Sequence, residues 1–123
     1  MANPNIVNVT SIYGNTTYLV PTGTSATTWT ALTPASGTVN KVENIVASNV
    51  TGTAALITVS INSATGGGGT AYRLAYQITV PANASLIVVD KSTSIYVGES
   101  QSIVITSGTS SAIEMIATYE AIT

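Results

Sequence analysis

Apolar and polar residues alternate in short stretches along most of the chain. In the clearest stretch, residues 72–80, every second residue is apolar: Tyr72, Leu74, Tyr76, Ile78 and Val80. A period of two is the pattern of a β-strand with one face in the core and one face outside. We therefore predict a strand here, with this apolar row pointing inward and the alternate row, which contains Arg73, pointing outward. Pro81 ends the strand because a proline has no N–H to donate.

A second alternating stretch covers residues 55–62, in which we expect Ile57, Val59 and Ile61 to point inward. Between the two stretches lies a run of four glycines: Gly66, Gly67, Gly68 and Gly69. A glycine-rich segment between two strands is typical of a hairpin connection. We predict a long hairpin with a mobile tip, which either adapts to a neighbouring subunit or is a plain connection. Phosphate binding is not expected, because a phosphate-binding loop needs Gly-Lys-Ser/Thr before a helix.

Further strand-like runs follow at intervals of about 8 to 12 residues, each bounded by residues that favour turns. They are residues 6–13, 17–20, 27–32, 39–49, 85–89, 94–97, 102–106 and 112–122. The pattern predicts an all-β fold: a two-sheet antiparallel β-sandwich, jelly-roll-like, with about 8 to 10 short strands. Immunoglobulin-like connections would give the same strand spacing. We expect residues 1–123 to form a single domain, with residues 1–5 as a free end or an extended N-terminal arm.

Charged residues are scarce in this chain. Three Lys and Arg and five Asp and Glu among 123 residues give a net charge of −2, whereas 45% of the residues are apolar. A surface that binds nucleic acid needs a cluster of cations, and Lys41, Arg73 and Lys91 are too few. We therefore expect no nucleic acid and no membrane among the partners. The apolar content also excludes a disordered chain.

The composition excludes several kinds of reactive or metal-binding site. The chain has no His and no Cys, so it lacks the usual ligands of zinc and iron–sulfur clusters and the commonest proton carrier. No apolar run reaches the roughly 20 residues of a membrane-spanning helix, and residues 1–5 lack the features of a secretory signal peptide. We predict no cofactor and no metal, and synthesis in a host cytoplasm.

The spacing of the carboxylates gives little support to catalysis. Glu114 and Glu120 lie on one predicted strand and point to the same face, but at about 3.3 Å per residue they stand about 20 Å apart. The two carboxylates of a glycosidase lie within about 10 Å of each other. Pairs that involve Glu43, Asp90 or Glu99 would need tertiary contacts that the spacing does not show. We expect no enzymatic activity, and we expect Asp90 to cap a turn.

Outward positions of the predicted strands are mainly Thr, Ser, Asn and Ala. Monomeric β-proteins usually protect exposed strand edges with charges, and a neutral surface costs less to bury than an ionic one. The composition therefore favours burial of this surface between subunits. The candidate interface residues are Tyr13, Tyr18, Trp29, Arg73, Gly66, Gly67, Gly68 and Gly69. The aromatic rings among them could instead stack on a sugar.

A set of strand and turn segments from residue 39 onward carries a family resemblance. The segments are KVENIVASN (41–49), VSI (59–61), YRL (72–74), ITVPANASL (78–86), GESQSI (98–103) and ATYEAI (117–122). Over about two thirds of the chain the pattern resembles small virion structural proteins of tailed bacteriophages, especially cyanophages and other aquatic phages. The resemblance implies a jelly-roll-like sandwich on the phage particle, often trimeric, and it implies no active site.

We therefore expect a non-enzymatic phage virion structural protein: a capsid decoration (cement) protein or a neck or tail accessory subunit. Its expected partners are copies of itself, with a trimer favoured, and other virion proteins such as the major capsid protein or a tail protein. The expected location is the virion. The alternative is a carbohydrate-recognition module on a phage fibre or cell surface, which would use an exposed Trp29 and tyrosines.

Overall fold

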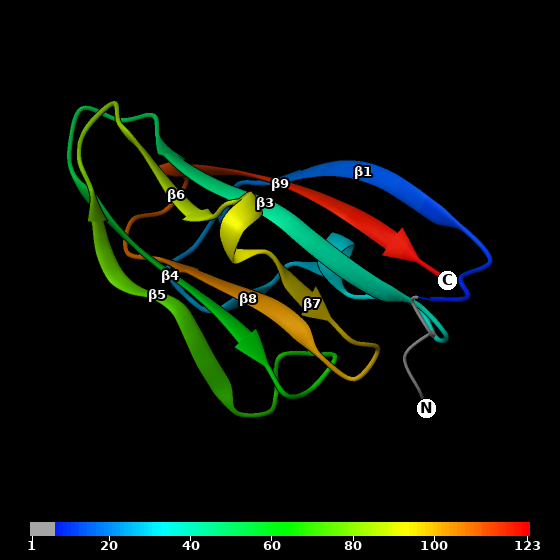
Figure 1. Ribbon diagram of the computed structural model, residues 1–123. Coiled ribbons are helices and arrows are strands. Elements are labelled where there is room, and N and C mark those ends of the chain that lie inside the picture. Colours follow the sequence, from blue (N-terminus) through cyan, green and yellow to red (C-terminus); the bar gives the residue numbers. More distant parts are fainter. Residues whose placement is uncertain (1–6) are drawn as a thin grey trace.

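A computed structural model describes residues 7–123, and the arm or free end expected at residues 1–5 lies outside the described residues. Residues 7–123 form nine strands and two short 3-10 turns (Figure 1). No helix among these residues is long and apolar enough to cross a membrane. The elements are β1 (Ile12–Leu19), β2 (Thr27–Thr28), η1 (Thr30–Leu32), β3 (Val39–Asn49), β4 (Ala55–Asn62), β5 (Ala71–Val80), β6 (Ser85–Val89), η2 (Lys91–Thr93), β7 (Ile95–Val97), β8 (Ser102–Ser107) and β9 (Ile113–Ile122).

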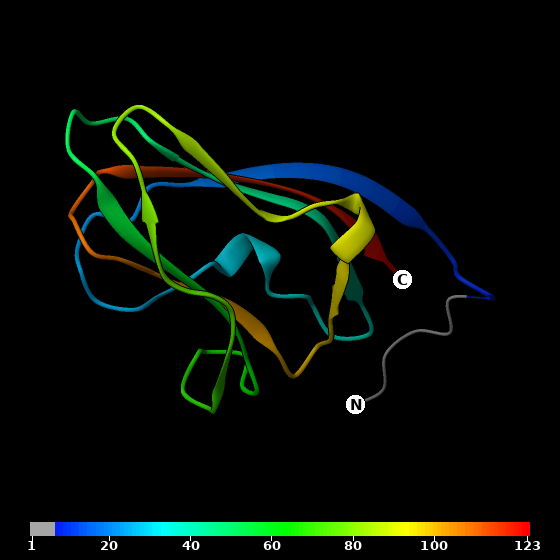
Figure 2. The ribbon, with the colours of Figure 1, turned by 60° about the vertical axis from the view of Figure 1, so that its left-hand side comes forward.

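The strands form two antiparallel sheets that pack face to face (Figure 2). Sheet A has the order β1-β9-β3-β6, with β7 also paired to β3, and sheet B has the order β2-β8-β4-β5. The chain thus pairs from its ends inward: β1 with β9, β2 with β8, β3 with β6 and β7, and β4 with β5. A ribbon of paired strands rolled into two sheets in this way is a jelly roll. The all-β sandwich prediction is confirmed, and the pairing order selects the jelly roll over the immunoglobulin-like connection.

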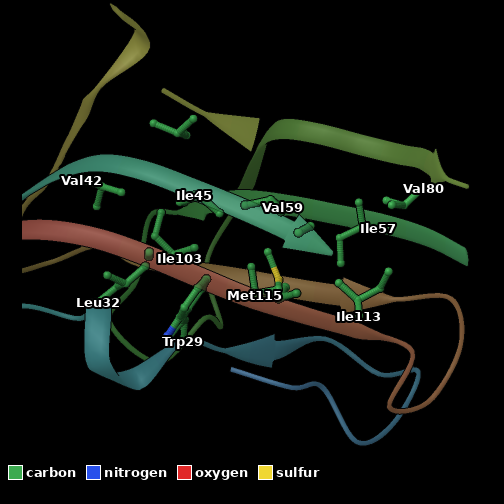
Figure 3. Packing of buried hydrophobic residues seen from close by; sticks show 14 of the residues in the cluster. Trp29, Leu32, Val42, Ile45, Ile57, Val59, Val80, Ile103, Ile113 and Met115 are labelled. Atoms are coloured by element: carbon green, nitrogen blue, oxygen red, sulfur yellow. The ribbon is translucent and has the colours of Figure 1, made fainter. Parts of the chain in front are cut away.

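Side chains from both sheets fill the space between them (Figure 3). As predicted, Ile57 and Val59 of β4 are fully buried. In β3 a bulge at Glu43 shifts the register against β9. Val42 and Ile45 are therefore both buried although they are three residues apart, which breaks the alternation of a regular strand. The other large, fully buried side chains include Leu32, Ile103, Ile105, Ile113 and Met115.

The first third of the chain differs from the predicted strand boundaries. We predicted separate strands at residues 6–13 and 17–20, whereas residues 12–19 form the single strand β1, paired throughout with β9. Pairing with a long neighbouring strand outweighs the weak strand preference of Gly14 and Asn15. The strand predicted at residues 27–32 is also shorter, because η1 follows directly after β2 and Trp29.

Asp90 caps η2, as the sequence predicts. Its carboxylate accepts hydrogen bonds from the backbone N–H groups of Ser92 (2.9 Å) and Thr93 (3.2 Å). These contacts, led by the hydrogen bond from the Ser92 hydroxyl, lower the pKa of Asp90. The capped turn separates β6 from β7, so this edge of sheet A is made of two short strands.

β5 forms as predicted, but most of its apolar row is not in the core. Within the row only Val80 is buried, and Ala75, from the row expected to face outward, packs against the core. The expected burial is therefore wrong for the rest of the row, although Tyr72 and Ile78 pair directly with the inward-facing Ile61 and Ile57 and so lie on the inner face at the edge of the sheet. The exposed members of the row are Tyr72, Leu74, Tyr76 and Ile78.

Two β-bulges explain the difference. Tyr76 and Gln77 of β5 lie opposite the single Thr58 of β4, and Leu74 is a further residue without a direct partner. Gln77 has a φ of 48°, in the left-handed region that side chains rarely adopt. Each bulge shifts the alternation of faces by one residue. The residues of β5 opposite the inward row of β4 are therefore Ile78, Ala75 and Tyr72, and Leu74 and Tyr76 leave that face. A strict period of two in the sequence therefore does not correspond to one face of the strand.

Candidate interaction surfaces

The aromatic candidates divide into exposed and buried residues. Tyr13 and Tyr18 of β1 are 65% and 81% exposed, so both remain candidates for an interface. Trp29 is 2% exposed and lies in the core (Figure 3), which corrects its assignment to the surface. Its backbone N–H donates to the Ile103 carbonyl (2.8 Å), and η1 begins directly after it, so the ring turns between the sheets. The carbohydrate alternative thereby loses its largest stacking ring.

The glycine run lies in the loop of residues 63–70, which folds over the outer face of sheet B. Asn62, only 3% exposed, holds this loop with its side-chain amide. Its Nδ2 donates to the carbonyls of Gly67 and Gly69, and its Oδ1 accepts from the N–H groups of Ala64 and Gly69, at 2.9–3.3 Å. The Thr28 hydroxyl of β2 also donates to the loop backbone (3.1 Å). The predicted hairpin is confirmed, and its tip is hydrogen-bonded to the sheet where we expected a mobile segment.

At two of the four positions in the run, the surrounding atoms leave no room for a Cβ atom. Gly67 has a φ of +77°, and a Cβ there would lie 2.6 Å from Oγ1 of Thr28. A Cβ on Gly69 would lie 3.0 Å from the backbone nitrogen of Ala64. Gly66 and Gly68 have nothing within 4 Å of the corresponding position. The sequence alone does not distinguish these two kinds of glycine.

Arg73 lies on the surface of sheet B beside exposed apolar side chains. Its guanidinium carbon is 5.2 Å from the ring centroid of Tyr76, a cation–π contact. That the same arginine meets a carboxylate of a neighbouring subunit stays a prediction. We call the exposed apolar residues of this edge the β5 band; they are Leu56, Tyr72, Leu74, Tyr76 and Ile78.

Sheet A carries a second apolar surface on its outer face. Tyr18 of β1 pairs with Ile116 of β9, Ile116 with Val46 of β3, and Val46 with Ile87 of β6. Directly paired residues share a face, so these four side chains form one line across four strands, about 14 Å at a spacing of about 4.8 Å. Ile116 is 49% and Ile87 61% exposed. We call this line the apolar row.

Sequence reasoning missed the apolar row. The sequence feature that marks the row is an apolar residue where the strand pattern calls for a polar one. In β9 this residue is Ile116, which lies between the buried Met115 and Ala117 and is exposed. In β6 the consecutive apolar residues of residues 86–89 give the same signal. Without knowing which strands are neighbours, however, the sequence cannot align such residues into one row.

A cluster of charged residues lies at the other end of the outer face of sheet A. Nζ of Lys41 is 3.2 Å from Oε1 of Glu43, and Lys41 pairs directly with Glu120 across β3 and β9. The hydrogen bond with Glu120, and then that with Lys41, lower the pKa of Glu43. The hydrogen bond with Glu43, and then desolvation, raise the pKa of Glu120. The two carboxyl groups thus interact across β3 and β9, a contact that spacing alone did not reveal.

This cluster contains two acidic residues and a lysine. Within residues 7–123, no group of three or more His, Cys, Asp or Glu side chains could hold a metal ion.

No protein-family model and no curated protein matches the chain. Among solved structures, the chain is similar to the virus-like particle of the extra small virus of the giant freshwater prawn Macrobrachium rosenbergii, determined by cryo-EM. The match covers 98% of this chain and 86% of that chain, with 14% sequence identity and a TM-score of 0.45. A likeness this distant does not establish a shared function.

Proposed function

We propose that the chain is a non-enzymatic structural protein of a phage virion, either a capsid decoration (cement) protein or a neck or tail accessory subunit. The observation that carries the proposal is the exposed apolar surface on both sheets of the jelly roll, the apolar row on sheet A and the β5 band on sheet B. A contiguous exposed apolar surface, such as the apolar row, usually marks a binding site. The resemblance of its segments to virion proteins of tailed phages supports a phage virion as the particle to which the chain belongs.

Such a subunit would act by mechanical attachment. The two surfaces lie on different sheets, so one copy can contact two neighbours, which are further copies, the major capsid protein or a tail protein. Apart from Glu114, the side chains next to the apolar row are neutral, among them those of Thr118, Ser48 and Ser85, and neutral groups cost less to desolvate than charges. Many modest contacts of this kind, held together in one particle, add up to strong attachment.

Light scattering of the purified full-length chain at several concentrations tests the self-association. We expect a mass above the 12.5 kDa of one chain, and a lower mass for the double variant Ile87→Thr, Ile116→Thr. Both side chains are about half-exposed, so the variant should unfold at nearly the same temperature. The matched control is Val50→Thr, an exposed apolar residue outside both surfaces. A 12.5 kDa monomer at every concentration would contradict self-association.

Labelling of particles tests the location. Antibodies against the recombinant chain should bind virions purified from a host culture infected by the phage that encodes it, as seen by immunogold electron microscopy. Mass spectrometry of the same particles should find the chain in many copies. Recovery of the chain from the soluble lysate alone, with no label on the particles, would contradict a virion role.

A further inference from the structure

The free edge of sheet A, formed by β1, differs from the other three sheet edges among residues 7–123. β2 has only two residues, the edge made of β6 and β7 is interrupted by η2, and β5 carries two bulges and Arg73. β1 is eight residues long, pairs with β9 without a register shift, and contains no charged residue and no proline. An edge of this kind accepts another strand, because nothing in it blocks pairing.

The backbone groups that point to this edge follow from the pairing of β1 with β9. Ser11 donates to Thr123 and Thr123 donates back to Ser11, so these two residues form a hydrogen-bonded pair. Along an antiparallel ladder such residues alternate with residues whose N–H and C=O groups point away from the partner strand. Because the register is continuous, every second residue after Ser11 faces the free edge. These residues are Ile12, Gly14, Thr16 and Tyr18.

We propose that β1 pairs antiparallel with β1 of a second copy of the chain, across a two-fold axis at Asn15. In this register Ile12 faces Tyr18 of the second copy and Gly14 faces its Thr16. The four edge-facing residues then form four pairs of two hydrogen bonds each, so all eight free backbone groups are used. An axis at Gly14 or Thr16 would form only three such pairs, or six bonds. The pairing deepens, and rests on, the self-association proposed above.

The side chains of β1 also fit this register. Ile12 is 51% and Tyr18 81% exposed, both on the outer face, and an aliphatic residue opposite an aromatic one stabilises a strand pair. Ile12 of the second copy would lie beside Tyr18 and extend the apolar row to a fifth strand. Each copy completes the row of the other, which is a reason for the partner to be a second copy.

Charge does not oppose the approach of a second copy, although each chain carries a net charge of −2. The charged residues nearest to β1 in the ladder, Glu114 and Glu120, lie on β9. In the pair, the two copies of β9 would be three strand spacings apart, about 14 Å. This separation exceeds the Debye length of about 8 Å at physiological ionic strength. Repulsion between the carboxylates of the two copies of β9 is therefore largely screened when two β1 strands pair.

A contact one strand wide is smaller than the standard interface of about 1,600 Å². We therefore expect the isolated dimer to dissociate on dilution and to persist in a particle, where other contacts hold the same subunits together.

Engineered cysteines test the register directly, because the natural chain has none. In Asn15→Cys the two sulfurs face each other across the axis, where residues of a non-hydrogen-bonded pair have Cα atoms about 4.5 Å apart, within the range of a disulfide. The matched control is Thr16→Cys, whose Cα atoms in the two copies would be about 8 Å apart, too far for a disulfide. Mild oxidation should cross-link the first variant at least about tenfold faster than the second. Equal rates, or faster cross-linking of Thr16→Cys, would overturn the register.

A second pair of variants tests the backbone edge. Thr16→Pro removes an N–H that points away from β9, so it should abolish the dimer while the circular dichroism spectrum is retained. Thr16→Val keeps that N–H and should keep the dimer. A dimer that survives Thr16→Pro would overturn the pairing.

The failure of this pairing can be told apart from the failure of the proposed function. If Asn15→Cys does not cross-link but light scattering still shows oligomers, β1 pairing is wrong and association through the apolar row or the β5 band stands. If both measurements show only monomer, the pairing and the self-association are contradicted, and the labelling of particles alone decides the virion role.

Discussion

At the scale of single residues, the pair of Glu43 and Glu120 makes stability depend on pH. The pKa of Glu120 is raised, first by its hydrogen bond to Glu43, so protonated Glu120 is favoured in the folded chain. Its contribution to stability is fully present below its unfolded pKa and is lost as the pH rises through its folded pKa. The lowered pKa of Glu43 acts in the opposite sense: its contribution is present above its unfolded pKa and is lost on acidification.

The variant Glu120→Gln separates these two effects. Gln carries an amide that donates to Glu43 as protonated Glu120 does, but it does not ionise. We expect the variant to be more stable than the natural chain above the folded pKa of Glu120, with a difference that shrinks as the pH falls. Urea unfolding at a series of pH values measures this difference. Glu114→Gln, on the outward face of the same strand, is the control, and an equal effect there would contradict the assignment.

At the scale of elements, the loop of residues 63–70 distinguishes glycines that look alike in the sequence. Gly67→Ala and Gly69→Ala should each lower the free energy of unfolding by about 1–3 kcal/mol, because the added methyl group has no room. Gly66→Ala and Gly68→Ala should be neutral or stabilise by up to about 1 kcal/mol, since alanine restricts the unfolded chain. Chemical denaturation of the four variants measures the contrast. Equal losses at all four positions would show that the loop does not pack on Thr28 as described.

The strands could be predicted from the sequence because alternation reports on local backbone geometry, as in β4, where Ile57 and Val59 are buried. The faces of β5 could not, because a bulge is set by the partner strand and leaves the alternation of the sequence unchanged. The burial of Trp29 depends on η1 and on a hydrogen bond to a distant strand. The apolar row could not be predicted either, because Tyr18 and Ile87 are brought into one line only by the two strands that lie between them.

At the scale of the whole molecule, few charges lie on the surfaces that we propose for association. Each of the three has one charged neighbour: Arg73 beside the β5 band, Glu114 two residues from Ile116 of the apolar row, and Glu120 opposite Gly14 of the β1 edge. Attraction between neutral and apolar surfaces is not screened by salt, whereas attraction between charges is. The response of the oligomer to salt therefore shows which kind of contact holds it.

Raising sodium chloride from 0.1 to 1 M shortens the Debye length from about 10 Å to about 3 Å. We expect the oligomer mass, measured by light scattering at fixed protein concentration, to stay constant or rise over this range. Ammonium sulfate should shift the equilibrium further toward the oligomer, since sulfate strengthens apolar burial. If Arg73 meets a carboxylate of a neighbouring subunit and that ion pair dominates, the mass should instead fall with salt, and Arg73→Gln should reproduce the fall at low salt. A fall that Arg73→Gln does not reproduce would indicate an ion pair that involves Lys41 or Lys91, and would contradict association through neutral surfaces.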